Sequence, residues 1–422
     1  MNVPKLRFKE FTGEWEEKRL SNYLYVNTAR NKNNIFNKND VLSVSGEFGI
    51  VNQILFQGRS FAGESVELYH VVETGDIVYT KSPLKANPYG IIKYNSGDAG
   101  IVSTLYAVYH CKPNCSGKFV EYYFDNDLRL NKYLKPLVNI GAKHDMKISD
   151  ENALSGNVIL PSYDEQCKID SFLKIIDERI EKQKDIIDTL SKQKKALMQK
   201  IFSQELRFKD EDGNDFPAWE EKKFDSVFEF LPTNTYSREE ASFFDGVIQN
   251  IHYGDILTKY SSIVDLDRVK LPYLSSEIEY KEEKLEKSKI KDGDIVIADT
   301  AEDYTVGKVC EVTNVGQGIV VAGLHTMLCR VTQGVSFASG YLGYYMNSSA
   351  YHDQLLPLIV GTKVSSIAKK YLIKTVLQVP CLKEQEKIVG LLLAIDQKVE
   401  ITKKELEYWQ QIKKGLLQQM FV

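Results

Sequence analysis

Basic, amide and aromatic side chains gather in two loop-like segments of this 422-residue chain. The first segment is KSPLKANPY, from Lys81 to Tyr89, and the second is DYTVGK, from Asp303 to Lys308. Lysine and hydroxyl groups bind phosphates, while lysine and asparagine read base edges, so these residue types suit contacts with a nucleic acid. Ordinary solvated loops have the same composition, and the residue types alone leave both interpretations open.

A glycine turn followed by lysine occurs once in each half of the chain, as Gly141-Ala142-Lys143 and as Gly361-Thr362-Lys363. Backbone N–H groups at such a turn, together with the lysine, suit a clamp on a phosphate backbone. An ordinary turn that ends a domain explains the pattern equally well.

The sequence predicts no catalytic residue and no metal site. It contains no G-x-x-x-x-G-K-[ST] phosphate loop, no H-E-x-x-H and no G-x-S-x-G. The six cysteines are scattered, which predicts reduced thiols rather than a disulfide framework. They are Cys111, Cys115, Cys167, Cys310, Cys329 and Cys381.

The chain on either side of these loops is duplicated. Residues 159–202 recur about 219 positions later as residues 378–421, with the pattern P-x-x-x-E-Q-x-K-I at the start of each copy. Leu6-Arg7-Phe8 reappears as Leu206-Arg207-Phe208, and Trp15-Glu16-Glu17-Lys18 as Trp219-Glu220-Glu221-Lys222. A repeat of this length predicts one architecture built twice. The segments between the matches differ, which indicates either two different recognition surfaces or simple drift.

Each copy of the repeat ends in a heptad pattern that predicts a long helix in a coiled coil. The alternative is a single amphipathic helix packed on its own domain. In both copies eight of ten seam positions are apolar, and the polar exceptions fall at equivalent places, Gln183 with Thr402 and Lys194 with Lys413. The first predicted seam is Ile169, Leu173, Ile176, Ile180, Ile187, Leu190, Leu197 and Ile201. The second is Ile388, Leu392, Ile395, Val399, Leu406, Trp409, Leu416 and Met420.

The charges along each helix predict that the two helices run antiparallel. Acidic residues dominate the first part of each helix and lysines the last part. Antiparallel pairing places each basic end beside the acidic end of its partner, whereas parallel pairing stacks like charges. At 1.5 Å per residue, about 38 residues make a rod of roughly 57 Å.

The remaining segments predict a mixed α/β (α+β) fold. Short β-rich runs are cut by glycine, asparagine, aspartate and proline, and helical stretches at 118–134 and 340–356 follow them. We therefore predict a first domain at 1–160, a long helix at 161–204, a second domain at 205–379 and a second long helix at 380–422. No run is apolar enough to span a membrane, and a cytoplasmic location is expected. The formal net charge of −4 does not exclude nucleic-acid binding, because binding needs only a local basic face.

The duplicated motifs resemble those of the specificity subunit of type I restriction-modification systems, over essentially the whole chain. The resemblance implies two target-recognition domains and an antiparallel coiled coil, each domain reading one half of a bipartite target in double-stranded DNA. It implies that the helices set the spacer and dock two methyltransferase subunits, which bind S-adenosylmethionine, while restriction subunits use ATP and Mg²⁺. No cofactor is expected on this chain, and no enzymatic activity of its own.

The resemblance also implies that six residues of the loops and turns described above face DNA. These are Lys81, Lys85, Tyr89, Lys143, Lys308 and Lys363. Two other classes of function compete with this one. A coiled-coil adaptor whose two domains bind proteins is the first alternative, and a divergent nuclease or methyltransferase is the second.

Overall fold

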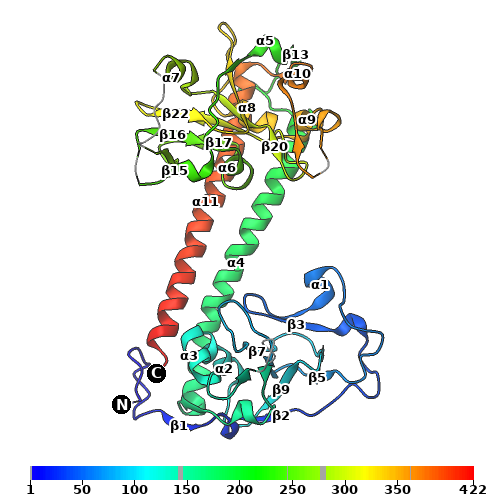
Figure 1. Cartoon of the computed structure of the whole chain (residues 1–422), viewed down its shortest axis with the longest axis vertical. Coiled ribbons are helices and arrows are strands. Elements are labelled where there is room, and N and C mark those ends of the chain that lie inside the picture. The colour runs from blue at the N-terminus through cyan, green and yellow to red at the C-terminus, as the bar shows by residue number, and fades with distance from the viewer. Residues whose placement is uncertain (1, 141–145, 245, 276–281, 362) are drawn as a thin grey trace. The chain divides into compact units, whose positions relative to one another are not determined.

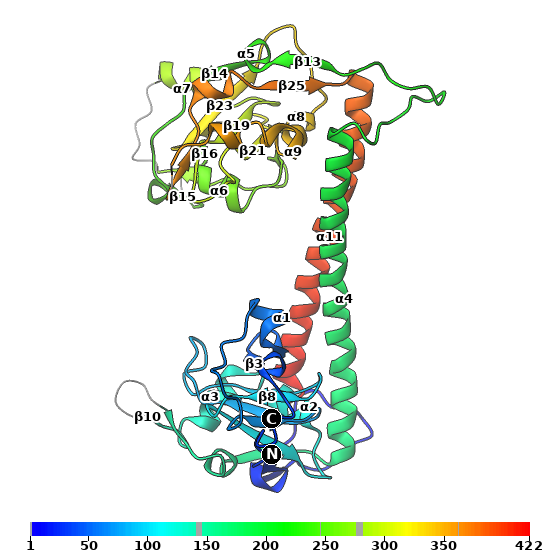
Figure 2. The same cartoon turned by 90° about the vertical axis from the view of Figure 1, so that its right-hand side faces the viewer.

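A computed structural model describes the chain except for residues 1, 141–145, 245, 276–281 and 362. The chain forms two compact units (Figures 1 and 2). Unit 1 comprises Met1–Asp185 and Lys403–Val422, and unit 2 comprises Ile186–Thr402. The division falls inside the two long helices, so each unit contains part of both. The domain boundaries at residues 160, 204 and 379 stay a prediction.

Unit 1 is built on a four-stranded antiparallel sheet with the strand order β2-β9-β6-β7. Its central strand β6, from the sequence IVYT, is buried along its whole length, as expected of an apolar β-branched run inside a domain. The strands are β1 (Glu16–Arg19), β2 (Leu24–Val26), β3 (Leu42–Ser45), β4 (Gly49–Asn52), β5 (His70–Val72), β6 (Ile77–Thr80), β7 (Ile92–Tyr94), β8 (Gly100–Val102), β9 (Tyr106–Cys111), β10 (Asn139–Ile140), β11 (Met146–Lys147) and β12 (Asn157–Leu160).

The helices of unit 1 are short until the long helix begins. They are α1 (Gln53–Gln57), α2 (Gly117–Phe124), α3 (Asp127–Leu134) and the first part of α4 (Tyr163–Phe202), with 3-10 turns at Leu20–Asn22, Lys38–Asp40 and Asn152–Leu154. The predicted helical stretch 118–134 is therefore two helices. The break arises because the Asn126 side chain accepts a hydrogen bond from the Arg129 N–H and so caps a new helix.

Unit 2 has a five-stranded sheet with the order β14-β23-β19-β21-β17 and a second sheet with the order β15-β18-β16-β22. The strands are β13 (Glu220–Lys223), β14 (Phe228–Leu231), β15 (Ala241–Ser242), β16 (Ile248–Ile251), β17 (Ile263–Asp265), β18 (Tyr273–Leu274), β19 (Ile295–Ala298), β20 (Thr300–Ala301), β21 (Val309–Thr313), β22 (Ile319–Ala322), β23 (Thr326–Val331), β24 (Ser365–Ser366) and β25 (Val376–Val379). The helices are the last part of α4, α5 (Phe224–Val227), α6 (Tyr253–Thr258), α7 (Glu282–Ser288), α8 (Tyr341–Met346), α9 (Ser349–His352), α10 (Lys369–Leu372) and the first part of α11 (Leu382–Gln419), with 3-10 turns at Arg238–Glu240 and Leu356–Leu358.

The two units share a topology, which explains the repeat in the sequence. The order β2-β9-β6-β7 in unit 1 matches β14-β23-β19-β21 in unit 2, and β1 pairs with β12 as β13 pairs with β25. The repeated GDIV run enters β6 in one unit and β19 in the other. The predicted α/β architecture with an internal repeat is therefore confirmed.

The helices α4 and α11 pack against each other in each unit, and they run antiparallel. In unit 1, Asp177 forms an ion pair with Lys413, and Gln183 donates a hydrogen bond to Glu405. Residue numbers that increase along α4 therefore meet residue numbers that decrease along α11. In unit 2, Lys194 pairs with Asp396 in the same sense. The direction predicted from charge is confirmed.

The predicted seam positions face the interior of their units. Each of the sixteen is buried or half-buried, and Ile169, Leu173 and Met420 join the core of unit 1, while Ile201, Ile388 and Leu392 join the core of unit 2. Among the described residues, no helix is long and apolar enough to cross a membrane.

Candidate nucleic-acid interface

The glutamate of the Glu-Gln pair that opens each long helix holds the segment with the repeated LRF and WEEK motifs. We call this segment the arm; it spans residues 6–18 in unit 1 and residues 206–222 in unit 2. In unit 1 the buried carboxylate of Glu165 accepts hydrogen bonds from Arg7, at 2.7 Å from Nε and 2.8 Å from Nη2, and from the indole Nε1 of Trp15 at 3.3 Å. Charge-assisted, bidentate pairs of this kind are strong and geometrically specific. The arm is thereby fixed to the first turn of α4.

Unit 2 repeats this arrangement. The fully buried carboxylate of Glu384 accepts from Arg207, at 3.1 Å from Nε and 2.6 Å from Nη2, and from the indole Nε1 of Trp219 at 3.0 Å. The duplicated LRF and WEEK motifs are therefore structural partners of the helix openings, which the sequence shows only as separate matches.

The glutamine of each pair ties the long helix to the segment just before a short helix, α2 in unit 1 and α8 in unit 2. Gln166 donates from Nε2 to the carbonyl of Pro161 (3.0 Å) and accepts from the Ser116 N–H (3.0 Å). In unit 2, Gln385 donates to the carbonyl of Pro380 (2.8 Å) and accepts from the Ala338 N–H (2.9 Å). Both amides are buried and satisfied on their two sides, as buried polar groups should be.

A tyrosine, an aspartate and a lysine join both long helices to a short helix in unit 1. The Tyr122 hydroxyl of α2 donates to Asp177 of α4 at 2.7 Å, and Lys413 of α11 lies 2.8 Å from the same carboxylate. Burial lowers the pKa of Lys413, but the carboxylates of Asp125 and Asp177 more than offset this, so its pKa is raised and its charge is kept. We call these three residues the helix joint of unit 1.

The helix joint of unit 2 also consists of a tyrosine, an aspartate and a lysine, but the two long helices exchange the residues that they contribute. Tyr344 of α8 donates to Asp396 at 2.7 Å, and the Lys194 ammonium lies 2.6 Å from Asp396 and 4.9 Å from the centre of the Tyr344 ring. Here the aspartate is on α11 and the lysine on α4. Sequence reasoning identified the two lysines as polar seam positions but missed the tyrosines. A Tyr-Tyr pair occurs in both halves of the sequence, at 122–123 and 344–345, and this repeated pair could have identified the two tyrosines.

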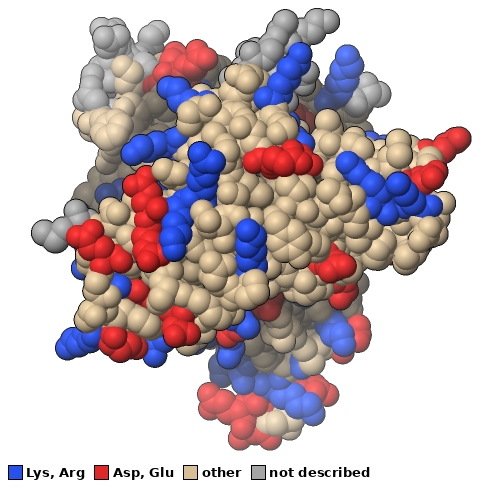
Figure 3. All heavy atoms as spheres, turned by 90° about the horizontal axis from the view of Figure 1, so that it is seen from below, with Lys and Arg blue, Asp and Glu red and all other residues tan. Residues whose placement is uncertain are grey.

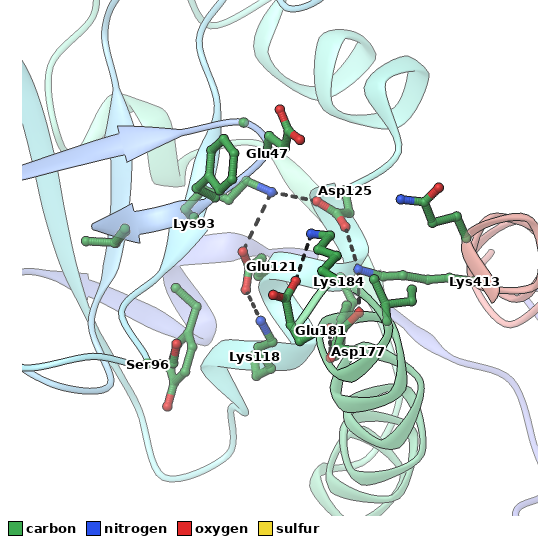
Figure 4. Close-up of a pocket in the computed structure, with 18 residues that line it drawn as sticks. Glu47, Lys93, Ser96, Lys118, Glu121, Asp125, Asp177, Glu181, Lys184 and Lys413 are labelled. Carbon is green, nitrogen blue, oxygen red and sulfur yellow. Dashed lines mark hydrogen bonds and ion pairs between the residues drawn. The ribbon is translucent and has the colours of Figure 1, made fainter. Parts of the chain in front are cut away.

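A pocket in unit 1 lies beside its helix joint, and the labelled lysines around it lie against carboxylates (Figure 4). The nearly buried Lys93 lies 2.7 Å from Asp125 and 3.6 Å from Glu121. Burial lowers the pKa of Lys93, but the two carboxylates outweigh burial and raise it. These lysines serve internal ion pairs, so the pocket offers little positive charge to a phosphate.

The first loop predicted to face DNA is partly occupied by internal contacts. Lys81 forms an ion pair with Asp150, and the carbonyl of the half-buried Tyr89 accepts a hydrogen bond from the Tyr79 hydroxyl (2.7 Å). Lys85 is exposed. Of these three predicted residues, Lys81 has an ionic partner, the Tyr89 ring packs partly against the core of unit 1, and Lys85 is exposed.

In unit 2, too, one predicted lysine has an internal partner and another is exposed. Lys308 is half-buried and donates to the Leu257 carbonyl at 2.9 Å, and burial lowers the pKa of its ammonium. Lys363 is exposed in the turn before β24. Lys143, its predicted counterpart, lies outside the described residues.

The face of the molecule drawn in Figure 3 shows no concentrated patch of one charge. In the face seen from below, Lys and Arg side chains stand among Asp and Glu, and uncharged side chains separate them (Figure 3). No group of three or more His, Cys, Asp or Glu among the described residues could hold a metal ion. On this face, contacts with a polyanion are therefore expected from local segments rather than from one broad basic patch.

Acid should destabilise unit 1 through a buried histidine. His70 is 3% exposed, and burial, together with the charge of Arg30, lowers its pKa to about 4. Between that value and the ordinary pKa near 6.5, an unfolded chain binds a proton that the folded chain does not, so the free energy of unfolding falls as the pH drops through this window.

The test compares urea unfolding at pH 7 and pH 5 for the natural chain, for His70→Leu and for a control, His325→Leu, at an exposed position of unit 2. The loss of stability on acidification should be smaller in His70→Leu than in the other two. Equal losses in all three proteins would contradict the assignment.

Known proteins resemble this chain in sequence and in fold, although no protein-family model matches it. The chain is 25% identical over 269 residues to the type I restriction enzyme MjaVIII specificity subunit of Methanocaldococcus jannaschii, covering 61% of this chain and 59% of that protein. The chain thus matches about three fifths of the length of this curated relative.

Two solved structures share the architecture. One is the type I restriction-modification system S subunit from M. genitalium, with a TM-score of 0.55, 14% identity and coverage of 100% of this chain and 99% of that one. The other belongs to a structural study of complex assembly and conformational transition of the type I R-M system, with a TM-score of 0.52, 16% identity and coverage of 96% and 97%. At such identities the likeness is one of fold. In sequence over the matched part and in fold over nearly its whole length, this chain is similar to the specificity subunits of type I restriction-modification systems, as its duplicated motifs predicted.

Proposed function

We propose that this chain is the DNA specificity subunit of a type I restriction-modification complex. One observation carries the proposal: a single framework, with the same arm, helix opening and helix joint, is built twice around an antiparallel helix pair. The surfaces carried by the two frameworks differ in sequence. This is the arrangement that a reader of two unlike half-sites needs.

The long helix that supplies the aspartate of the helix joint in one unit supplies the lysine in the other unit. This exchange supports a two-fold relation in function. Asp177 and Lys194 lie on α4, while their equivalents Asp396 and Lys413 lie on α11. Two-fold related modules read half-sites on opposite strands. Because the two frameworks carry different surfaces, the target is asymmetric, and the helices set the length of its spacer.

The partners follow from the same proposal. The helices dock two methyltransferase subunits, which supply S-adenosylmethionine chemistry, and restriction subunits supply the ATP- and Mg²⁺-dependent steps. This chain contributes recognition rather than catalysis. The exposed Lys85 and Lys363 contact the phosphate backbone.

The test is methylation mapping by long-read sequencing in a methylation-free host that expresses this chain with its neighbouring methyltransferase subunit. The expected result is a bipartite, asymmetric motif methylated on both strands and absent when this chain is omitted. A complex that forms but methylates no motif dependent on this chain would contradict the proposal. It would favour a protein adaptor in its place.

A further inference from the structure

The segment Thr28–Asn39 of unit 1, between β2 and β3, differs in composition from the chain around it. Its sequence TARNKNNIFNKN holds three basic residues, five asparagines and no acidic residue, although the whole chain has a formal net charge of −4. Positive charge with amide side chains is the combination that contacts phosphates and reads base edges.

A buried asparagine gives this segment a fixed shape. The Asn31 side chain is 2% exposed, donates from Nδ2 to the carbonyl of Phe36 (2.8 Å) and accepts from the Phe36 N–H (3.1 Å). The same Nδ2 lies 3.3 Å from the carbonyl of Val66, and the Asn34 N–H donates to the Asn31 carbonyl (2.9 Å). The residues between Asn31 and Phe36 therefore form a closed loop anchored to a neighbouring segment before any ligand binds.

The closed loop presents its polar side chains to solvent. Lys32, Asn33 and Asn34 are exposed, and Ile35 is 77% exposed. Within the described part of the chain, the side chains of Lys32, Asn33 and Asn34 make no hydrogen bond or ion pair. A preorganised loop with uncommitted donors and acceptors loses little entropy on binding.

Unit 2 uses the same place in its framework for a different surface. After β2 the side chain of the buried Asn27 accepts from the Ala29 N–H (2.9 Å), and after β14 the buried Asn234 accepts from the Tyr236 N–H (3.1 Å). Beyond this shared turn, unit 2 continues with Ser237-Arg238-Glu239-Glu240, which carries two acidic residues where Thr28–Asn39 of unit 1 carries none. A constant turn followed by unlike side chains is expected where two related modules recognise different ligands.

We propose that Thr28–Asn39 is a base-reading segment of unit 1 and contacts one half-site in the major groove. The inference deepens the proposed function and rests on it. The amides of Asn33 and Asn34 match the N6 and N7 edge of adenine, the Lys32 ammonium matches guanine O6 and N7, and Ile35 suits the thymine methyl group. Asn31 and Asn27 position the loop and do not contact DNA.

The experiment removes the exposed side chains and leaves the buried ones. The variants are Lys32→Ala, Asn33→Ala and Asn34→Gly, with glycine chosen because Asn34 has φ +49°. Lys135→Ala, at another exposed lysine of unit 1, is the control. Each protein is expressed with the methyltransferase subunit, checked for complex formation, and mapped for methylation.

The expected result is a relaxed preference at one or two base pairs of a single half-site. Discrimination against the wrong base should fall roughly 5- to 150-fold for each bidentate side chain–base pair that a substitution removes. The other half-site, the spacer and the Lys135→Ala motif should remain those of the natural chain. Variant complexes that keep the full natural motif, with or without a uniform loss of affinity, would overturn base reading by this segment. If the natural chain itself directs no bipartite motif, the proposed function fails instead, so the two failures are distinguishable.

Discussion

Replacing Ile180 with aspartate is expected to lower the free energy of unfolding of unit 1 by at least about 3 kcal/mol. Ile180 is 7% exposed on α4, at a predicted seam position between the long helices. The substitution removes a buried apolar side chain and places an ionised carboxylate at a buried position. The change is measured as the shift in the urea midpoint followed by circular dichroism.

The same helix supplies a matched control. Ile175 is also an apolar residue of α4, but it is 63% exposed. The substitution Ile175→Asp makes the same chemical change and should alter the stability by less than about 0.5 kcal/mol, as surface substitutions usually do. Similar midpoints for the two variants would show that the seam does not stabilise unit 1.

Replacing Arg207 with leucine is expected to destabilise unit 2 by about 3–5 kcal/mol, because it leaves the carboxylate of Glu384 buried without its cation. Glu384 is fully buried and, among the residues that the structure describes, would retain the Trp219 indole as its one side-chain donor. Urea unfolding at pH 7 measures the effect.

The double variant Arg207→Leu/Glu384→Leu separates the cost of an unpaired charge from the loss of packing. Since no charge is then left buried, it should be more stable than Arg207→Leu alone. A double variant as unstable as the sum of its two single variants would mean that the two residues act independently. Arg7 and Glu165 allow the same cycle in unit 1.

Local periodicity made the long helices predictable. A heptad pattern depends on which residues recur along one helix, and that information is contained in consecutive residues such as 169–201. The antiparallel direction was also accessible, because the excess of acid at one end and of lysine at the other is a property of each helix alone. The duplicated motifs, finally, predicted the repeat and the family resemblance.

Contacts between distant segments account for what the sequence could not show. Arg7 and Glu165 are 158 residues apart, and their pairing explains why LRF and E-Q both recur. Lys81 was predicted to face DNA, but Asp150, 69 residues away, pairs with its ammonium. Composition cannot distinguish a lysine that is free to bind phosphate from one that already has a partner.

The segment Thr28–Asn39 combines both kinds of information. Its basic and amide residues are visible in the sequence, yet their exposure depends on Asn31, which is held against Phe36 and Val66. The repeat, the helix pair and its direction follow from patterns along the chain, and they could therefore be predicted from consecutive residues. Which charged and amide side chains remain available to a ligand depends on partners that folding brings from elsewhere in the chain, so this became clear from the folded structure alone.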